Sequence, residues 1–278
     1  MVELSDNLRD VLKEGSTFLK GKGVSNAKKE LEWFCEKKFQ YSLIDIYTNN
    51  IFLRENEIKT LQNFIARRIN DEPFQYIINS APFLNYDFYV NPHVLIPRPE
   101  TEIIFKVLKN RFFKTALDVG TGSGNIAISL KLKNLAQSIT AIDCESKSLE
   151  IAKLNAKSLG AKDIDFLKAD LFNYQFCNSY DLVVSNPPYI SKKDYHCLSD
   201  SIKKYEPAIA LTDYQEGYSF YQYFAENINC ILKPQGTMIL EVGLEKTKNK
   251  IEKLFKNQAN LIWHKDYNHD YRILEINA

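Results

Sequence analysis

The chain has few of the residues that cross-link a protein or bind a metal. Its five cysteines, at positions 35, 144, 177, 197 and 230, are odd in number and widely spaced, and none forms a C-x-x-C pair. This pattern excludes a disulfide framework and a zinc finger, so each cysteine is expected to be a small buried apolar residue. No group of His, Cys and carboxylate residues has the spacing of metal ligands, and we expect no metal.

Long apolar runs and an excess of one charge are also missing. The longest stretch without Asp, Glu, Lys or Arg is residues 73–86; it is 14 residues long and holds two prolines, too short and broken to cross a bilayer. The first residues lack the pattern of a signal peptide. With 36 basic against 35 acidic residues, a strongly basic nucleic-acid clamp is disfavoured. We expect a cytoplasmic protein with no membrane contact and no direct nucleic-acid partner.

What is present is an ordinary globular composition, 45% hydrophobic and 26% charged, organised in three parts. Residues 1–72 predict a small all-α domain, in which Ile58, Leu61, Ile65 and Ile69 form an apolar stripe at helical spacing. Residues 73–100 predict a β-hairpin linker, because apolar and polar residues alternate over 84–90 and residues 75–78 can supply a partner strand. Residues 101–278 form the third part.

Strand and helix patterns alternate in residues 101–278. Strands are expected at 115–119, 139–143, 164–168, 182–185 and 237–242, and helices at 124–134, 146–159, 215–232 and 244–256. Such alternation predicts an α/β fold with a parallel sheet covered by helices on both faces. The strands near 260–265 and 271–276 have too short a connection for a parallel crossover, so this pair should be antiparallel.

A glycine-rich turn joins the first strand of this sheet to a helix. The P-loop motif is excluded because Asn125-Ile126 follows the last glycine, and a dinucleotide fingerprint would need glycine at 125. The acid-x-G-x-G-x-G pattern that begins at Asp118 resembles S-adenosylmethionine-dependent methyltransferases. The residues expected to bind this cofactor, which becomes S-adenosyl-L-homocysteine, are Gly120, Thr121, Gly122, Ser123 and Gly124.

Two further positions follow the next strands of the sheet. Asp143 ends the second strand, where a carboxylate can accept hydrogen bonds from both ribose hydroxyls; the alternative is that it caps the helix near Ser146. Asp170 follows the third strand and can accept from the adenine amino group, while Leu171 can pack on the adenine face. Methyltransferases often have an aromatic residue after this acid, and leucine departs from that pattern.

Asn186-Pro187-Pro188-Tyr189 follows the fourth strand. The prolines stiffen the segment and have no N–H, so the Asn186 side chain and the Pro187 carbonyl can accept from a planar –NH2 group. Tyr189 supplies an aromatic wall near the cationic sulfonium. We assign all four residues to substrate binding, Asn186, Pro187 and Tyr189 to catalysis, and Asn186 also to the cofactor. The rate gain is positioning and electrostatics, without a covalent intermediate.

Several segments, in their order along the chain, resemble one family. They are residues 72–77 (EPFQYI), 95–102 (LIPRPETE), 118–124 (DVGTGSG), 186–189 (NPPY), 205–211 (YEPAIAL) and 241–243 (EVG). The chain is similar to peptide chain release factor N5-glutamine methyltransferases of the PrmC/HemK type. The resemblance implies a Rossmann-like seven-stranded core with an antiparallel last strand, and methylation of the Gly-Gly-Gln glutamine of class-I release factors. It also implies that the N-terminal domain helps to bind the protein substrate.

Other functions stay open at this point. A relative that methylates a glutamine of a ribosomal protein shares the core and Asn-Pro-Pro-Tyr. A nucleic-acid adenine-N6 methyltransferase shares the tetrapeptide but should carry a basic face, whereas residues 1–72 hold 12 basic and 12 acidic side chains. A non-catalytic cofactor-binding scaffold would not need the acceptor pair at Asn186 and Pro187. We expect a monomer.

Overall fold

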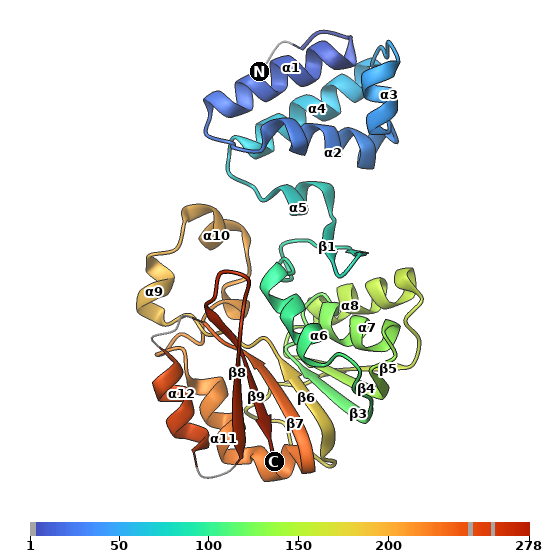
Figure 1. Cartoon of the computed structure of the whole chain (residues 1–278). Helices are drawn as coiled ribbons and strands as arrows, with labels where there is room; N and C mark the ends of the chain where they lie inside the picture. Colours follow the sequence, from blue (N-terminus) through green and yellow to red (C-terminus); the bar gives the residue numbers. More distant parts are fainter. Residues whose placement is uncertain (1–3, 244–246, 257–258) are drawn as a thin grey trace. The chain divides into compact units, whose positions relative to one another are not determined.

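The structure, a computed structural model, describes residues 4–243, 247–256 and 259–278. It divides into two compact units, Met1–Asn79 and Ser80–Ala278 (Figure 1). The division at Asn79 differs from the boundary at residue 72 that the sequence suggested.

The N-terminal unit is helical in its described residues. Its helices are α1 (Leu8–Gly21), α2 (Ala27–Phe39), α3 (Leu43–Thr48), α4 (Glu55–Arg68) and α5 (Phe74–Ile78). Of the predicted stripe, Leu61 and Ile65 are buried with Leu31 and Phe34 of α2, and Ile58 is partly buried against them. Ile69 does not belong to this core, because it follows the last residue of α4 and is 39% exposed.

The hairpin is shorter than predicted, and its expected first strand is a helix. Residues 74–78 form α5 because Phe74, Ile77 and Ile78 have helical spacing and pack into the core of the N-terminal unit. The hairpin pairs β1 (Ala81–Phe83) with β2 (Tyr86–Phe88). Its two turn residues, Leu84 and Asn85, both have positive φ, as a two-residue primed turn requires.

The second unit contains the alternating elements. The sheet strands are β3 (Phe113–Val119), β4 (Ala136–Asp143), β5 (Ile164–Lys168), β6 (Tyr180–Ser185), β7 (Leu232–Glu241), β8 (Asn260–Lys265) and β9 (Tyr271–Asn277). The helical elements are η1 (Pro99–Glu102), α6 (Ile103–Val107), α7 (Asn125–Leu132), α8 (Ser146–Leu159), α9 (Lys192–His196), α10 (Asp200–Tyr205), η2 (Ala208–Ala210), α11 (Ser219–Ile231) and α12 (Lys248–Phe255). Residues 244–246 of the predicted helix 244–256 lie outside the described residues. Within the described ranges, no helix is long and apolar enough to cross a membrane.

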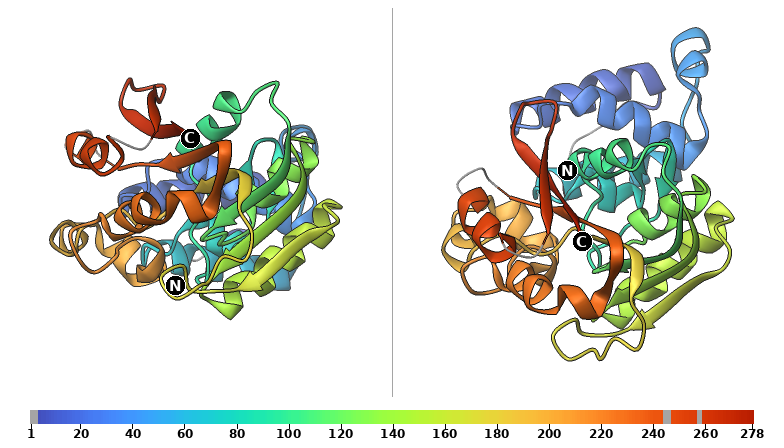
Figure 2. Two further views of the ribbon diagram at one scale, coloured as in Figure 1. Left: turned by 90° about the horizontal axis from the view of Figure 1, so that it is seen from below. Right: turned by 60° about the horizontal axis from the view of Figure 1, so that its bottom comes forward.

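Among the described residues the sheet has the order β5-β4-β3-β6-β7-β9-β8 (Figures 1 and 2). The pairs from β5 through β7 are parallel, and β9 is antiparallel to both β7 and β8. The predicted Rossmann-like methyltransferase topology is confirmed. Alternate residues of each strand face opposite sides, so the sheet has two apolar faces to cover.

Helices cover both faces of the sheet, as Figure 2 shows. On one face, Ala116 and Leu182 are buried with residues of α6 and α7. On the other, Leu117 and Val183 are buried with residues of α11 and α12. Because the consecutive residues Ala116 and Leu117 belong to different clusters, β3 is buried on both sides over its last four residues.

The cysteines do not follow the expectation of uniform burial. Cys35 is buried and Cys144 is partly buried, whereas Cys177, Cys197 and Cys230 are exposed.

The burial pattern gives a test of the core. Phe224 on α11 is 0% exposed, whereas Phe112, just before β3, is 63% exposed. We expect Phe224→Ala to lower the free energy of unfolding of the second unit by about 3–5 kcal/mol, and Phe112→Ala to change it by less than about 0.5 kcal/mol. Denaturant titration of both variants measures the difference, and equal losses would show that the assigned core is wrong.

Candidate active site

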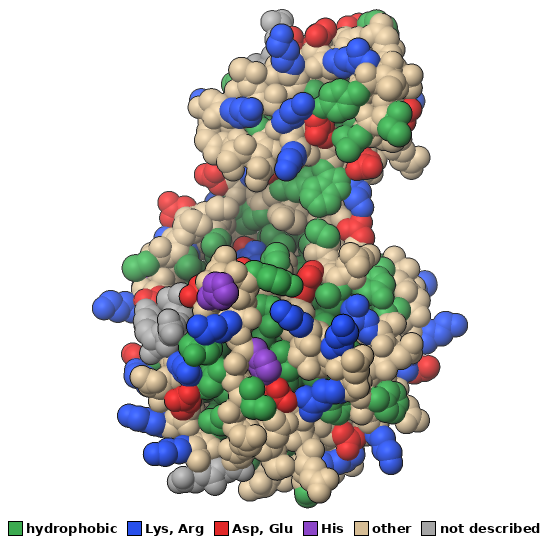
Figure 3. Space-filling model, in the orientation of Figure 1, with side chains coloured by type: hydrophobic (Ala, Val, Ile, Leu, Met, Phe, Trp, Pro, Cys, Tyr) green, Lys and Arg blue, Asp and Glu red, His purple; other side chains and the backbone are tan. Residues whose placement is uncertain are grey.

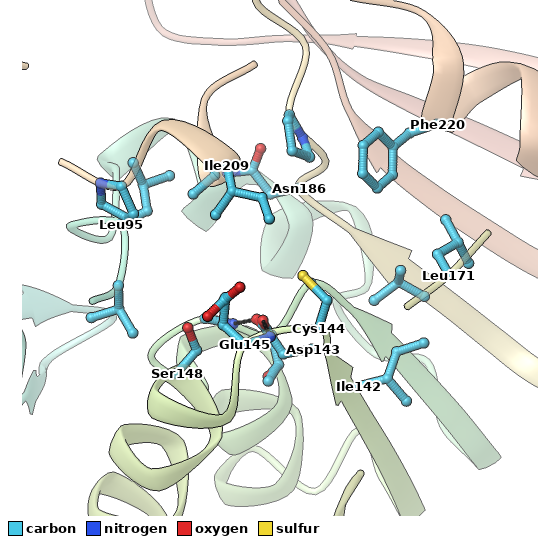
Figure 4. Close-up of a pocket in the computed structure, with 18 of the residues that line it drawn as sticks. Leu95, Ile142, Asp143, Cys144, Glu145, Ser148, Leu171, Asn186, Ile209 and Phe220 are labelled. Carbon is cyan, nitrogen blue, oxygen red and sulfur yellow. Dashed lines mark hydrogen bonds between the residues drawn. The ribbon is translucent and has the colours of Figure 1, made fainter. Parts of the chain in front are cut away.

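A cavity of about 470 Å³ opens at the carboxyl ends of the parallel strands, within the range of small-ligand sites. It lies wholly within the second unit. Among its lining residues are predicted site residues from four separate loops: Gly120, Thr121, Gly122, Ser123, Asp143, Asp170, Leu171, Asn186 and Pro188. The close-up in Figure 4 shows Asn186, Asp143, Leu171 and Phe220 around one hollow.

The glycine turn is shaped by a buried carboxylate behind it. Gly120, Gly122 and Gly124 all have positive φ, which glycine adopts without steric cost. Asp118 is 0% exposed, and its Oδ2 accepts from Thr121 Oγ1 at 2.7 Å and from the Ala127 backbone N–H at 3.1 Å. These two bonds hold the turn against the first turn of α7, where free N–H groups can face an anionic ligand.

Burial makes the carboxyl group of Asp118 bind its proton more tightly than an exposed carboxyl does. Its Oδ1 has no hydrogen-bond partner among the described residues, and desolvation raises the pKa of the carboxyl to about 7. The bonds from Thr121 and Ala127 act in the opposite direction because they favour the ionised form.

Asp143 lies at the end of β4 and is already bonded to the backbone. Its Oδ2 accepts from Gly122 N at 2.9 Å, and its Oδ1 accepts from Glu145 N at 2.9 Å. Burial raises the pKa of Asp143. A carboxylate has about four acceptor positions, so two stay available to ribose hydroxyls. The alternative that Asp143 caps the helix near Ser146 is wrong, because the N-cap of α8 is Glu145; the Asp143 carboxylate orders the turn before the helix instead.

The opposite side of the cavity is an apolar slot. Figure 4 shows Ile142, Leu171 and Phe220 gathered there. Phe220, on α11, packs edge-on against Phe172 with ring centroids 4.9 Å apart. An aromatic ring is therefore present beside Leu171, although it comes from a distant helix. Asp170 is exposed, and its carboxylate accepts from Phe172 N and Asn173 Nδ2, which orders the turn around Leu171.

The four residues of Asn-Pro-Pro-Tyr have different positions. Asn186 and Pro188 line the cavity, but Pro187 is buried, and neither Pro187 nor Tyr189 is among the described lining residues. The Tyr189 ring packs on the backbone of Gly243, where an added Cβ would lie 2.9 Å from Cδ2. Gly124 likewise lies behind the lining, against Ile128 and Ala152. The direct ligand contacts of Gly124, Pro187 and Tyr189 stay predictions.

The structure adds residues that sequence analysis did not single out. Thr101 lines the cavity and bonds to both Asn186 and the buried Glu241. Arg98 Nη2 contacts both carboxylate oxygens of Glu206 at 2.7 and 2.6 Å, joining two cavity loops 108 residues apart. Asn155 on α8 donates to the Ser123 carbonyl. All of these residues except Asn155 lie in segments that the sequence analysis had named, which are 95–102, 205–211 and 241–243. The sequence did not show which of them pair with one another.

Family models match both parts of the chain. The Methyltransferase small domain model matches residues 99–204, and the PrmC N-terminal domain model matches residues 10–78.

Individual proteins are also similar. A release factor glutamine methyltransferase of Geobacter sulfurreducens is 33% identical over 85% of this chain and 84% of its own. That of Enterococcus faecalis is 34% identical over 85% of this chain and 86% of its own. Among solved structures, a methyltransferase from Pyrococcus furiosus has a TM-score of 0.53 at 20% identity, covering 78% of this chain and 98% of that one. This structural likeness concerns the fold.

Titration of Asp118 should appear in the pH dependence of stability. Because its pKa is about 7 in the folded protein, above the unfolded value, the folded state binds more protons between about pH 4 and 7. Stability attributable to this group therefore falls as pH rises through that window. Relative to Asp118→Asn, the wild-type free energy of unfolding should fall by roughly 2–4 kcal/mol between pH 4 and 8. Denaturant titrations at several pH values measure this difference, and a pH-independent difference would contradict it.

Proposed function

The chain belongs to the family of release factor glutamine methyltransferases, and on this premise we propose its substrate and mechanism. The protein transfers the methyl group of S-adenosylmethionine to the N5 amide nitrogen of the glutamine in the Gly-Gly-Gln motif of class-I release factors. The observation that carries the proposal is that one cavity joins the glycine turn and Asp143 to Asn186.

The cavity has the features that S-adenosylmethionine needs. The turn at Gly120–Gly122 allows close approach to the backbone, and the Asp143 carboxylate keeps acceptor positions for the ribose. The apolar slot formed by Leu171, Ile142 and Phe220 suits the flat adenine ring. When bound, this cofactor supplies an electrophilic methyl group on a sulfonium.

Asn186 is the residue that receives the substrate amide. A glutamine amide nitrogen is a weak nucleophile because its lone pair is delocalised into the carbonyl, so its orientation must be fixed. One N–H donates to Asn186 Oδ1 and the other to the Pro187 carbonyl, which holds the nitrogen toward the methyl group. The nitrogen forms the new bond to carbon, the bond from carbon to sulfur breaks, and the methylated amide then loses one proton to solvent.

The acceptor class is tested by offering three substrates together with labelled S-adenosylmethionine. We expect label in an intact class-I release factor and none in double-stranded DNA or in a ribosomal-protein mixture. Label in the ribosomal proteins would show that the acceptor is a glutamine of a ribosomal protein and not that of a release factor. Label in DNA would show that the acceptor is an adenine amine and not a glutamine amide. A monomeric state, residence in the cytoplasm and the absence of a nucleic-acid partner stay predictions.

Replacement of Asn186 tests the acceptor role. Asn186→Ala should lower the rate of methyl transfer by about 10²–10³, because one hydrogen bond made in the transition state is lost. Cofactor affinity, measured by calorimetry, should stay within about tenfold, since the turn and Asp143 are unchanged. Asn227→Ala, on α11 and outside the described cavity lining, is the matched control. Near-normal turnover by Asn186→Ala would refute this mechanism.

We further propose that the N-terminal unit binds the release factor. Its α3 region exposes apolar side chains: Ile44 is 73% exposed, Phe52 60%, Tyr47 49% and Leu43 47%. Figure 3 shows hydrophobic side chains gathered on the visible face of this unit, with charged ones around them. Such a patch is a candidate protein contact.

A charge placed in this patch should separate docking from chemistry. Ile44→Glu should lower kcat/KM for the intact factor by about tenfold, since a central apolar contact contributes over 1 kcal/mol. Transfer to a short Gly-Gly-Gln peptide should be unchanged. Leu154→Glu, at a 49% exposed site on α8, is the control. Equal losses with peptide and factor would show that α3 supports the fold instead.

A further inference from the structure

A buried polar chain lies behind Asn186. The Nδ2 of Asn186 donates to Thr101 Oγ1 at 3.3 Å, and Thr101 Oγ1 donates to Glu241 Oε2 at 2.6 Å. Thr101 and Glu241 are each 1% exposed. The three residues come from the loop after β6, from η1 and from the end of β7, so only the folded unit brings them together.

The direction of these bonds is set by the single hydroxyl hydrogen of Thr101. An ionised carboxylate can only accept, so the hydroxyl donates to Glu241 and offers its lone pairs to Asn186. The lone pairs of Thr101 Oγ1 can accept hydrogen bonds from the N–H groups of Asn186 Nδ2. They cannot bond to Asn186 Oδ1, which is itself only an acceptor. Within residues 4–243, 247–256 and 259–278, Oδ1 of Asn186 has no hydrogen-bond partner, so it stays free to accept one from a ligand in the cavity.

We infer that Thr101, oriented by Glu241, is a positioning residue that fixes the side-chain amide of Asn186 with its oxygen free for the substrate. The inference rests on the proposed function, because that function needs an acceptor at this point. If the side-chain amide of Asn186 were rotated by 180°, Nδ2 would face the –NH2 group of the substrate. Both groups are donors, so no hydrogen bond could form between them. The correct orientation is therefore part of catalysis, although neither Thr101 nor Glu241 has to touch the substrate.

The protonation state of Glu241 decides whether the chain keeps its direction. Burial raises the pKa of Glu241 to about 7, the bond from Thr101 lowers it, and the surrounding charges act in both directions. Arg272 and Arg98 favour the ionised carboxylate and Glu100 disfavours it. The neutral phenols of Tyr189 and Tyr221 also lie near, and Tyr221 donates to the Glu241 backbone carbonyl at 2.8 Å.

A protonated Glu241 can donate to Thr101 Oγ1. The hydroxyl hydrogen is then free to point at Asn186 Oδ1, and both orientations of the amide become allowed. The ionised form is present above pH about 7, so transfer should be fastest there and should fall as pH decreases through that value.

Three variants test this chain. Thr101→Val removes the hydroxyl and keeps the shape, and should lower kcat about tenfold, the effect of one neutral hydrogen bond. Thr101→Ser restores the hydroxyl and should recover kcat to within about threefold of wild type. Glu241→Gln leaves a neutral side chain that does not fix the Thr101 hydroxyl, so kcat should be low at all pH values and its change with pH near 7 should disappear. Cofactor affinity should be unchanged in all three. Thr140→Val on β4, outside the described cavity lining, is the matched control.

A second readout does not depend on turnover. The side-chain amide resonances of Asn186, assigned by their loss in Asn186→Asp, can be followed by NMR without substrate. In the wild type at pH 8, their exchange with solvent should be slow, and their shifts should change with pH at the midpoint of Glu241. Both properties should be lost in Thr101→Val and retained in Thr101→Ser.

The outcomes separate this inference from the proposed function. Failure of the wild type to methylate a release factor would refute the proposed function, while the amide resonances still test the positioning role. Full kcat in folded Thr101→Val would overturn the inference. Persistence of the decrease at low pH in Glu241→Gln would also overturn it and would assign the titration to another group, such as Asp118. An Asn186 amide signal that does not respond to Thr101→Val would overturn it as well.

Discussion

The parallel pairing of β3 with β4 and β6 is the constraint on which the site depends. In this register Val119 lies beside both Ile142 and Ser185, so Gly120, Asp143 and Asn186 all follow at one edge of the sheet. Ser185 pairs in turn with Leu240, which places Glu241 at the same edge. Residues far apart in the chain therefore meet in one cavity, and a shift of one residue in any pair would turn their side chains to the other face of the sheet.

Two buried carboxyls, Asp118 and Glu241, support the two halves of this cavity. Desolvation raises the pKa of each to about 7. Asp118 holds the glycine turn through Thr121 and the start of α7, and Glu241 holds Thr101 beside Asn186. Both therefore shape the cavity from behind, on the proposed cofactor side and the proposed acceptor side. A buried carboxyl costs stability, and sites that organise chemistry are where such a cost is usually found.

The sequence predicted the elements better than the contacts between them. The alternation of strands and helices in residues 101–278 is visible as local periodicity, and it predicted the sheet. The glycine turn is visible because several glycines lie close together, and it predicted where the cavity would be. Residues 75–78 were misassigned because the four residues taken alone show no clear period. The helical spacing appears only when Phe74 is included, and the packing of Phe74, Ile77 and Ile78 in the N-terminal unit stabilises α5. The pairing of Thr101 with Glu241 spans 140 residues, and the ring of Phe220 reaches the cavity from α11; no local pattern encodes either.

The central claim is that Asn186 presents an oxygen to a glutamine amide in this cavity. A crystal structure of the protein with a Gly-Gly-Gln peptide and S-adenosyl-L-homocysteine tests it most directly. The account predicts the glutamine amide nitrogen within hydrogen-bonding distance of Asn186 Oδ1 and facing the sulfur, with Asn186 Nδ2 still bonded to Thr101. A glutamine bound outside the cavity, or an Asn186 that faces the peptide with Nδ2, would contradict it.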